Sequence, residues 1–548
     1  MLIIGAGGAG SRAAIEGAKQ GISVTILSKE PFGKAHTGKA MGGLNVAIKS
    51  PATPQQHYQD TITGGAYLNN QVMVDIFTKE MPDRIYDLES YGMKFDRLPD
   101  GSFYTWAGGK HSVPLNLCSG DHTGKEIMRA LSSEIRRLGI AFYENNYVTK
   151  LFIKYSRVVG VLSFNFENKT FYCFNAKAVI LASGGAGQLY QITSNEPSNT
   201  GEGYSLALDV GAELIDMEMI QFHPTGMAHP LKVRGSLITE KVRGHKGILY
   251  NSKKERFMKK YQPERLELAG RDEVARAIYT EIQEGRGSEH GGVWLDATML
   301  TKKDIKKLIP DVYKKFQKIG VDISKEWMEI TPTMHHVMGG VRINEWGETN
   351  VKGLFSCGEV AGGVHGANRL GGNSLAELQV FGRRSALRAI NYVKSTKNMK
   401  NIGVCIDAEL QRIYKLFDNI DGCSFKKIRK KLQQVMWDDV GIVRDKVGLK
   451  RAEKEVKRLM KISDSIKADK NSLTSVLETQ EMLKLALVVI KSALVRTESR
   501  GAHFRNDYSS TKKKWERNIV VFKKGGLLKI KTLKTVKLKK SVEKDFYK

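Results

Sequence analysis

Apolar and glycine positions at the start of the chain follow the order of a nucleotide-binding unit. Leu2, Ile3 and Ile4 form an apolar run, residues 5–10 are rich in glycine, and residues 24–27 are apolar again. The stretch between them predicts a helix. We therefore expect a strand, a glycine turn, a helix and a second strand, the beginning of a dinucleotide-binding domain. Because the first strand is so short, we expect the native chain to extend upstream.

Two later apolar runs also end in glycine. They occupy residues 178–181 and 353–357. An apolar run followed by glycine thus recurs far along the chain. This recurrence predicts one nucleotide-binding domain built from separated segments, residues 1–217 and 335–385. Residues 218–334 would then form an inserted domain.

The pattern changes in the last third of the chain. Residues 400–495 are highly charged, with apolar residues at three- and four-residue spacing, which predicts a helical domain. Residues 496–548 are basic and contain short β-like runs such as 519–522, which predicts a small C-terminal domain.

Composition places the chain among globular proteins. It has 548 residues, too many for one compact core, and 41% are hydrophobic. The longest apolar run, residues 485–495, is interrupted by Lys491, so no membrane span is expected. The N-terminus lacks the basic region and cleavage site of a signal peptide, which favours a cytoplasmic location.

The cysteines do not suggest a metal or disulfide framework. All five are widely scattered and none forms a CxxC pair. This pattern argues against disulfides, zinc and an iron–sulfur cluster, so we expect no metal site in this chain.

The formal net charge of +29 favours acidic ligands, anionic lipid or nucleic acid. No nucleic-acid-binding motif accompanies the charge. We interpret it as a solvated basic surface and expect no nucleic-acid partner.

The first glycine turn has a chemical rationale. Glycines let the backbone approach a pyrophosphate, and the following helix N-terminus offers oriented N–H groups. The acidic residue that usually ends the second strand of an NAD site is missing, because Ser28 and Lys29 stand there. A nicotinamide cofactor is therefore disfavoured.

Further motifs follow in a recognisable order. They are AHT at 35–37, AMGG at 40–43, NTGEG at 199–203, DMEMIQFHPT at 216–225, TE at 239–240, AGRD at 269–272, PTMH at 332–335, GEVAGGVHGANRLGGNSL at 358–375 and RTESRGAH at 496–503. This set closely resembles the flavoprotein subunit of succinate dehydrogenases and fumarate reductases. The resemblance implies an α/β fold: a Rossmann-like FAD-binding domain with an inserted α+β capping domain, followed by a helical domain and a small C-terminal domain.

The resemblance also implies the cofactor contacts. The glycines of the first turn would hold the FAD pyrophosphate, Glu359 the ribityl or adenosine part, and Ser374 and Leu375 the flavin ring through their backbone. The first-turn glycines are Gly5, Gly7, Gly8 and Gly10, and the other positions of the family's cofactor motifs are Ser28, Lys29, Thr37, Gly42, Gly43, Gly184 and Glu202.

Two positions near the expected flavin ring are informative. His36 matches the histidine through which this family attaches FAD covalently, and the resemblance favours attachment over a histidine that only packs on the flavin ring or a phosphate. Met41 stands where relatives carry glutamine or glutamate beside flavin N5. A methionine cannot hydrogen-bond there as those residues do, so the preferred direction of the reaction stays open.

The resemblance assigns a dicarboxylate site. His223, Thr239, His335 and Arg369 match the family's substrate residues, and the arginine fork suits a carboxylate. Arg271 matches the proton donor, which gives a proton to one alkene carbon of fumarate while flavin N5 gives a hydride to the other. Glu240 and Arg243 would relay protons to Arg271.

Three alternatives remain at this point. L-aspartate oxidase shares much of the pattern but normally lacks the histidine at position 36, and it has Ala-Ser where this chain has Gly371 and Gly372. Adenylylsulfate reductase is a more distant alternative. The third is a flavin-binding electron carrier without a substrate of its own, against which the retained substrate residues argue.

The resemblance finally implies partners. An iron–sulfur subunit would exchange electrons with the flavin, and membrane contact on the cytoplasmic face would be indirect, through other subunits. The final electron partner, quinone or thiol, and the oligomeric state are not indicated by the sequence.

Overall fold

The computed structural model describes residues 1–397, 406–419 and 422–538. Its centre is a five-stranded sheet in the order β17-β10-β1-β2-β6, in which all neighbouring strands run parallel. The strands are β1 (Leu2–Ile4), β2 (Thr25–Leu27), β6 (Ala141–Tyr143), β10 (Val179–Leu181) and β17 (Leu354–Ser356). Three of them, β1, β10 and β17, are buried along their whole length, as strands covered on both faces are.

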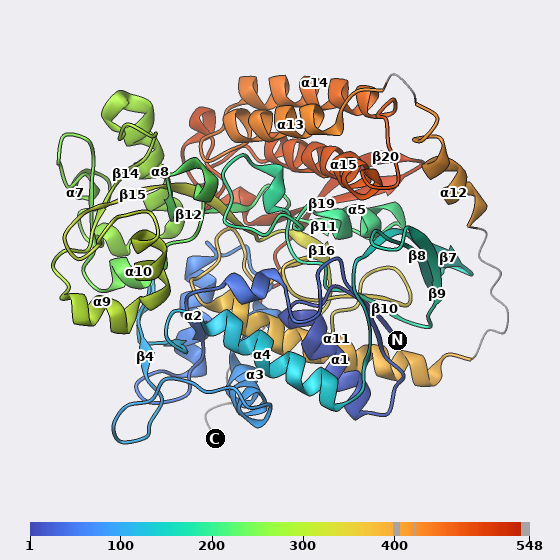
Figure 1. Ribbon diagram of the computed structural model, residues 1–548, viewed down its shortest axis with the longest axis horizontal. Coiled ribbons are helices and arrows are strands. Elements are labelled where there is room, and N and C mark those ends of the chain that lie inside the picture. The colour runs from blue at the N-terminus through green and yellow to red at the C-terminus, as the bar shows by residue number, and fades with distance from the viewer. Residues whose placement is uncertain (398–405, 420–421, 539–548) are drawn as a thin grey trace.

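Helices cover this sheet. Helices α1 (Gly8–Lys19) and α11 (Asn373–Ser395) pack on its strands, α4 (Thr123–Arg137) packs on α1, α3 (Gln71–Ser90) on α11 and α2 (Pro54–Gly64) on α3; Figure 1 shows these helices in the lower half of the molecule. Helix α1 approaches the first glycine turn so closely that a Cβ atom at Gly10 would lie 2.0 Å from the carbonyl oxygen of Gly5. Glycine at position 10 is therefore required for packing of the helix against the strand.

The inserted segment has a sheet and a core of its own (left in Figure 1). Its antiparallel sheet has the order β12-β15-β14-β13, with β12 (Ile220–Met227), β13 (Ile248–Tyr250), β14 (Val293–Asp296) and β15 (Met328–Val337). Helices α6 (Lys241–Gly244), α7 (Met258–Tyr261), α8 (Arg271–Glu281), α9 (Lys302–Leu308) and α10 (Pro310–Gln317) surround it. Strand β15 continues three residues past position 334, the boundary that we predicted from the sequence.

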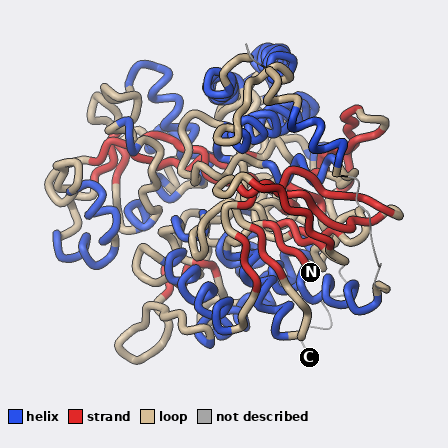
Figure 2. Tube along the Cα trace, turned by 45° about the vertical axis from the view of Figure 1, so that its right-hand side comes forward, coloured by secondary structure: helices blue, strands red, loops and turns tan. Residues whose placement is uncertain are grey.

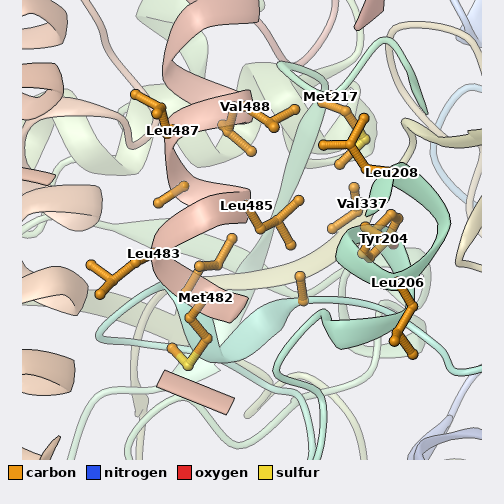
Figure 3. Packing of buried hydrophobic residues seen from close by; sticks show 14 of the residues in the cluster. Tyr204, Leu206, Leu208, Met217, Val337, Met482, Leu483, Leu485, Leu487 and Val488 are labelled. Atoms are coloured by element: carbon orange, nitrogen blue, oxygen red, sulfur yellow. The ribbon is translucent and has the colours of Figure 1, made fainter. Parts of the chain in front are cut away.

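The helical region packs on the nucleotide-binding part through α15. Its helices are α12 (Asp407–Tyr414), α13 (Phe425–Asp439), α14 (Lys446–Ser463) and α15 (Leu473–Val495); the start of the predicted helical stretch, residues 400–405, lies outside the described residues. Figure 3 shows Leu485 and Val488 of α15 facing Tyr204 and Leu208 of α5 (Glu202–Asp209). The apolar run that the sequence shows at 485–495 is thus a buried core helix.

The C-terminal segment adds two strands to a sheet of the nucleotide-binding part. Strands β19 (Arg517–Lys524) and β20 (Leu527–Lys534) form a hairpin, and β19 pairs with β11 (Leu214–Ile215). The same sheet contains β16 (Gly340–Arg342) and β18 (Ala361–Gly362). Figure 2 shows the central strands lying between the lower and upper groups of helices.

Two three-stranded sheets complete the fold. One consists of β3 (Leu44–Asn45), β5 (Asn116–Leu117) and β4 (Thr105–Trp106), the other of β7 (Asn146–Lys154), β8 (Arg157–Asn165) and β9 (Thr170–Asn175). Within the part of the chain that the structure describes, no helix combines the length and apolar content needed to cross a membrane.

Candidate active site

A deep cavity lies where the carboxyl ends of the parallel strands meet the inserted segment. Its wall contains nearly all the residues that the sequence singled out. From the cofactor set these are Gly5, Gly7, Gly8, Ser28, Lys29, His36, Thr37, Gly42, Gly43, Gly184, Glu202, Glu359, Ser374 and Leu375; from the substrate set they are His223, Thr239, His335 and Arg369, and from the catalytic set Arg271 and Glu240. The structure does not place Gly10 or Arg243 on the wall.

The glycine turn forms one end of the cavity. Gly5 has a φ of 106°, and a Cβ atom there would lie 2.2 Å from the carbonyl oxygen of Ala182. Helix α1 begins at Gly8, whose N–H donates to Thr37 Oγ1 at 3.0 Å. The first-turn N–H groups of a helix have no partner within the helix, so this end of the cavity suits an anionic group. Gly10 serves this arrangement through packing alone.

Lys29 and Glu202 lie on the wall as an ion pair. Lys29 Nζ is 2.8 Å from Glu202 Oε1 and 3.0 Å from Glu478 Oε1 on helix α15. Burial disfavours the charged amine, but the two glutamates outweigh that effect and raise the pKa of Lys29. The wall next to β2 is therefore held by a buried charge network that reaches the helical region.

Glu359 is a buried residue whose carboxylate can accept further hydrogen bonds. Its Oε1 accepts from the Val337 N–H at 3.0 Å, and burial raises its pKa to about 7. A Cβ atom at Gly185 would lie 2.1 Å from Glu359 Oε1, so only glycine at 185 leaves room for this carboxylate. Such a group can accept hydrogen bonds from ligand hydroxyls.

His36 has an unpaired ring nitrogen. It begins a short 3₁₀ helix (His36–Lys39), and its Nδ1 atom is buried without a hydrogen-bond partner. Burial, followed by the nearby cations Lys39 and Arg369, lowers the pKa of His36 to about 4. The imidazole is therefore neutral at pH 7.

Two histidines from paired strands meet at the other end of the cavity. The rings of His223 on β12 and His335 on β15 lie edge to face, with centroids 5.2 Å apart. His223 Nδ1 accepts from the Thr225 N–H at 3.2 Å, which leaves the Nε2 proton free to donate. Burial, with the nearby arginines, holds the pKa of both histidines well below its ordinary value. Both imidazoles are therefore held toward the neutral form, and His223 can donate from Nε2.

The positive charge of this end comes from arginines. Arg271, the first residue of α8, donates from Nε and Nη2 to Glu240 Oε2 at 2.9 and 2.6 Å. Burial alone would raise the pKa of Glu240, but Arg271 and Arg243 outweigh it and lower that pKa to about 2. Burial and then Arg271 lower the pKa of Arg369 to about 9.

Arg243 lies behind Glu240 and is itself buried. Its Nη2 atom is 3.9 Å from Glu240 Oε1, and its Nη1 donates to the Glu267 carbonyl at 2.6 Å. Only 2% of Arg243 is exposed. The charged side chains Arg271, Glu240 and Arg243 therefore follow one another into the protein, and Arg243 itself does not reach solvent.

Several residues at this site were not predicted from the sequence. Asn116, Ser194 and His336 line the cavity, and Ser194 Oγ lies 2.9 Å from His335 Nδ1. Gln221 lies behind the arginines. It stands two residues before His223, so the alternation of a strand could have placed both on one face.

Met41 contacts the inserted segment. It is buried, lines the cavity, and packs with the core of that segment. Lys315 on α10 reaches it, with Nζ 3.4 Å from Met41 Sδ. Met41 therefore connects the nucleotide-binding part of the chain with the inserted segment.

Comparisons with known proteins agree with this geometry. A family model described as "FAD binding domain" matches residues 1–375, and one described as "Fumarate reductase flavoprotein C-term" matches residues 429–544. A subunit of the fumarate reductase (CoM/CoB) of Methanothermobacter marburgensis is 44% identical over 96% of this chain and 97% of its own length. The chain belongs to the succinate dehydrogenase/fumarate reductase flavoprotein family. It is thus a flavoprotein oxidoreductase.

Other relatives of this flavoprotein bear different names. The succinate dehydrogenase flavoprotein subunit of Rickettsia bellii is 34% identical over 93% of this chain and 90% of its own length. The chloroplastic L-aspartate oxidase of Oryza sativa is 36% identical over 95% of this chain and 83% of its own length. Among solved structures, an E. coli quinol fumarate reductase FrdA variant superposes with a TM-score of 0.93 at 30% identity, covering 98% of this chain and 96% of that one. The predicted fold class is confirmed.

The cofactor of such a flavoprotein is FAD, and the cavity fits it. Helix α11 begins at Asn373, after Gly372 at a φ of 90°, so the N–H groups of Ser374 and Leu375 lie in its unpaired first turn. A Cβ atom at Gly42 would meet no atom within 4 Å, so this wall is open to a bulky group. The glycine turn suits the pyrophosphate, Glu359 suits hydroxyls, and the start of α11 suits the ring.

Proposed function

We propose that this flavoprotein interconverts succinate and fumarate. The proposal rests on one observation. The cavity that contains the glycine turn is also lined by two arginines, two histidines and a threonine: Arg271, Arg369, His223, His335 and Thr239. A four-carbon diacid has a carboxylate at each end, and enclosing it needs cations and neutral donors for both. Two arginines and the histidine and threonine donors provide that combination.

Arg271 is proposed as the proton donor in fumarate reduction and the acceptor in succinate oxidation. When bound, FAD supplies the hydride chemistry of the reaction. Arg271 lies close to Arg369 and Arg243, and its positive charge contributes, after burial, to the lowered pKa of both of those arginines. Glu240, ionised because Arg271 and Arg243 lower its pKa to about 2, orients the guanidinium, and a proton that this carboxylate first takes up from water would pass from it to the deprotonated Arg271.

The test of the proposal is an anaerobic assay of the purified protein with succinate, fumarate and L-aspartate, using artificial electron acceptors and donors. We expect turnover with succinate and fumarate and none with L-aspartate, whose ammonium group would need a carboxylate beside the arginines. The carboxylate next to Arg271 is that of Glu240, and it already accepts hydrogen bonds from Arg271. Oxidation of L-aspartate without fumarate or succinate turnover would support the aspartate oxidase alternative and refute the proposal.

We further propose that His36 carries FAD covalently. The neutral ring with an unpaired nitrogen on the cavity wall supports this. After acid precipitation of the holoprotein, we expect the yellow chromophore to stay with the protein, and to be released from His36→Ala. The control is His229→Ala, an exposed histidine of the inserted segment, which should retain the chromophore. Release of the flavin from the wild-type protein would show that attachment is noncovalent.

We propose that this chain works in an assembly with an iron–sulfur subunit and contacts the cytoplasmic face of the membrane indirectly. The support is that the Methanothermobacter relative is named as one subunit of a reductase and the E. coli structure as a quinol enzyme. The first name includes CoM/CoB and the second a quinol, so the names of these relatives do not point to one electron partner.

A further inference from the structure

Gln221 connects the two arginines of the site from behind. It lies on β12, is fully buried, and does not line the cavity. Its Oε1 atom accepts from Arg271 Nη1 at 3.2 Å and from Arg369 Nη2 at 3.0 Å. One neutral oxygen therefore bridges the substrate-binding arginine and the arginine proposed to donate the proton.

The orientation of this amide is determined by its other contacts. Gln221 Nε2 donates to Asn368 Oδ1 at 2.7 Å and to the Arg369 carbonyl at 2.8 Å. Asn368 in turn donates to Asp272 Oδ1 at 2.7 Å. A flipped amide would point its N–H groups at two guanidiniums, which have donors only. The oxygen must therefore face the arginines.

The neutrality of this bridge matters electrostatically. The two guanidiniums repel each other in a buried setting, and the repulsion contributes to the lowered pKa of Arg369. A carboxylate between them would stabilise both but would also cancel positive charge that a dianionic ligand needs. An amide oxygen holds them in place and leaves their net charge unchanged.

We propose that Gln221 is a positioning residue that fixes Arg271 and Arg369 relative to each other while leaving both positive charges to a dicarboxylate. The inference rests on the proposed succinate and fumarate chemistry. This positioning role differs from a purely structural one in a measurable respect. The affinity for a dicarboxylate should depend more on the charge of the side chain at position 221 than on its hydrogen bonds.

The test compares Gln221→Glu, which adds a charge with almost no change of shape, with Gln221→Met, which removes the acceptor without adding charge. Dissociation constants of malonate, a nonreacting dicarboxylate, would be measured from the flavin absorption difference spectrum of the holoprotein. We expect Gln221→Glu to weaken malonate binding and raise the KM for fumarate by roughly tenfold or more. Gln221→Met should weaken binding less and instead lower kcat and shift its pH profile, because Arg271 loses an orienting contact.

The control is Gln59→Glu on the exposed face of α2, which adds the same charge away from the cavity and should change neither value. Equal malonate affinity in Gln221→Glu and the wild type would overturn the inference. If Gln221→Glu does not fold, an unchanged kcat and pH profile in Gln221→Met would overturn it instead. A wild-type holoprotein that binds no dicarboxylate would overturn the proposed function, which is a separate outcome.

Discussion

Arg271→Ala is expected to lower fumarate reduction by about three orders of magnitude, within the range that loss of a general acid produces. The guanidinium is fixed by two hydrogen bonds from Nε and Nη2 to Glu240 and by one from Nη1 to Gln221. Arg369 cannot readily replace it, because the same glutamine holds that side chain in its own position. FAD should stay bound, because the glycine turn and the start of α11 do not depend on Arg271.

This result would be measured as kcat under anaerobic conditions with a reduced viologen dye, alongside the flavin content from absorbance. Arg276→Ala is the matched control, since Arg276 lies on the same helix but stacks on Phe504, 4.6 Å from the ring centroid. It should keep nearly full turnover. Full turnover in Arg271→Ala would show that another group donates the proton.

Arg496→Met is expected to lower the free energy of unfolding by about 3–5 kcal/mol, the usual loss when one partner of a buried ion pair is removed. Arg496 is fully buried, with Nε 2.7 Å from Glu218 Oε1 and Nη1 3.1 Å from Glu498 Oε1. The variant leaves both carboxylates buried without this cation. Burial and Glu218 already raise the pKa of the adjacent Asp216 to about 7, so the acidic cluster depends on the arginine.

The measurement is the shift of the urea unfolding midpoint of the holoprotein. Arg458→Met provides the control: its pair with Glu455 lies on the surface of α14, with 57% of the arginine side chain exposed, and such pairs contribute at most about 1 kcal/mol. We expect little change in the unfolding midpoint of Arg458→Met. An equal shift in both variants would mean that the loss is not caused by the buried carboxylates. Because Glu218 lies two residues before the start of β12, the network also anchors the strand that carries Gln221 and His223.

Local elements of the fold and most of the site could be predicted from the amino-acid order. Short apolar strands, glycines with positive φ and the helix after them are set by interactions within about twenty residues, so β1, the glycine turn and α1 were predictable directly. The site residues lay in motif strings that resemble a known family. All but Gly10 and Arg243 lie together on the cavity wall.

Contacts between distant segments, in contrast, became visible only in the folded chain. The pairing of β19 with β11, the place of β6 at the sheet edge and the contact of Lys315 with Met41 join residues far apart in sequence. The bridge of Gln221 to two arginines and the burial of Arg243 are of the same kind. A local pattern shows that a side chain is polar or apolar. Its charge state and partners depend on desolvation and on charges that approach only when the chain is folded.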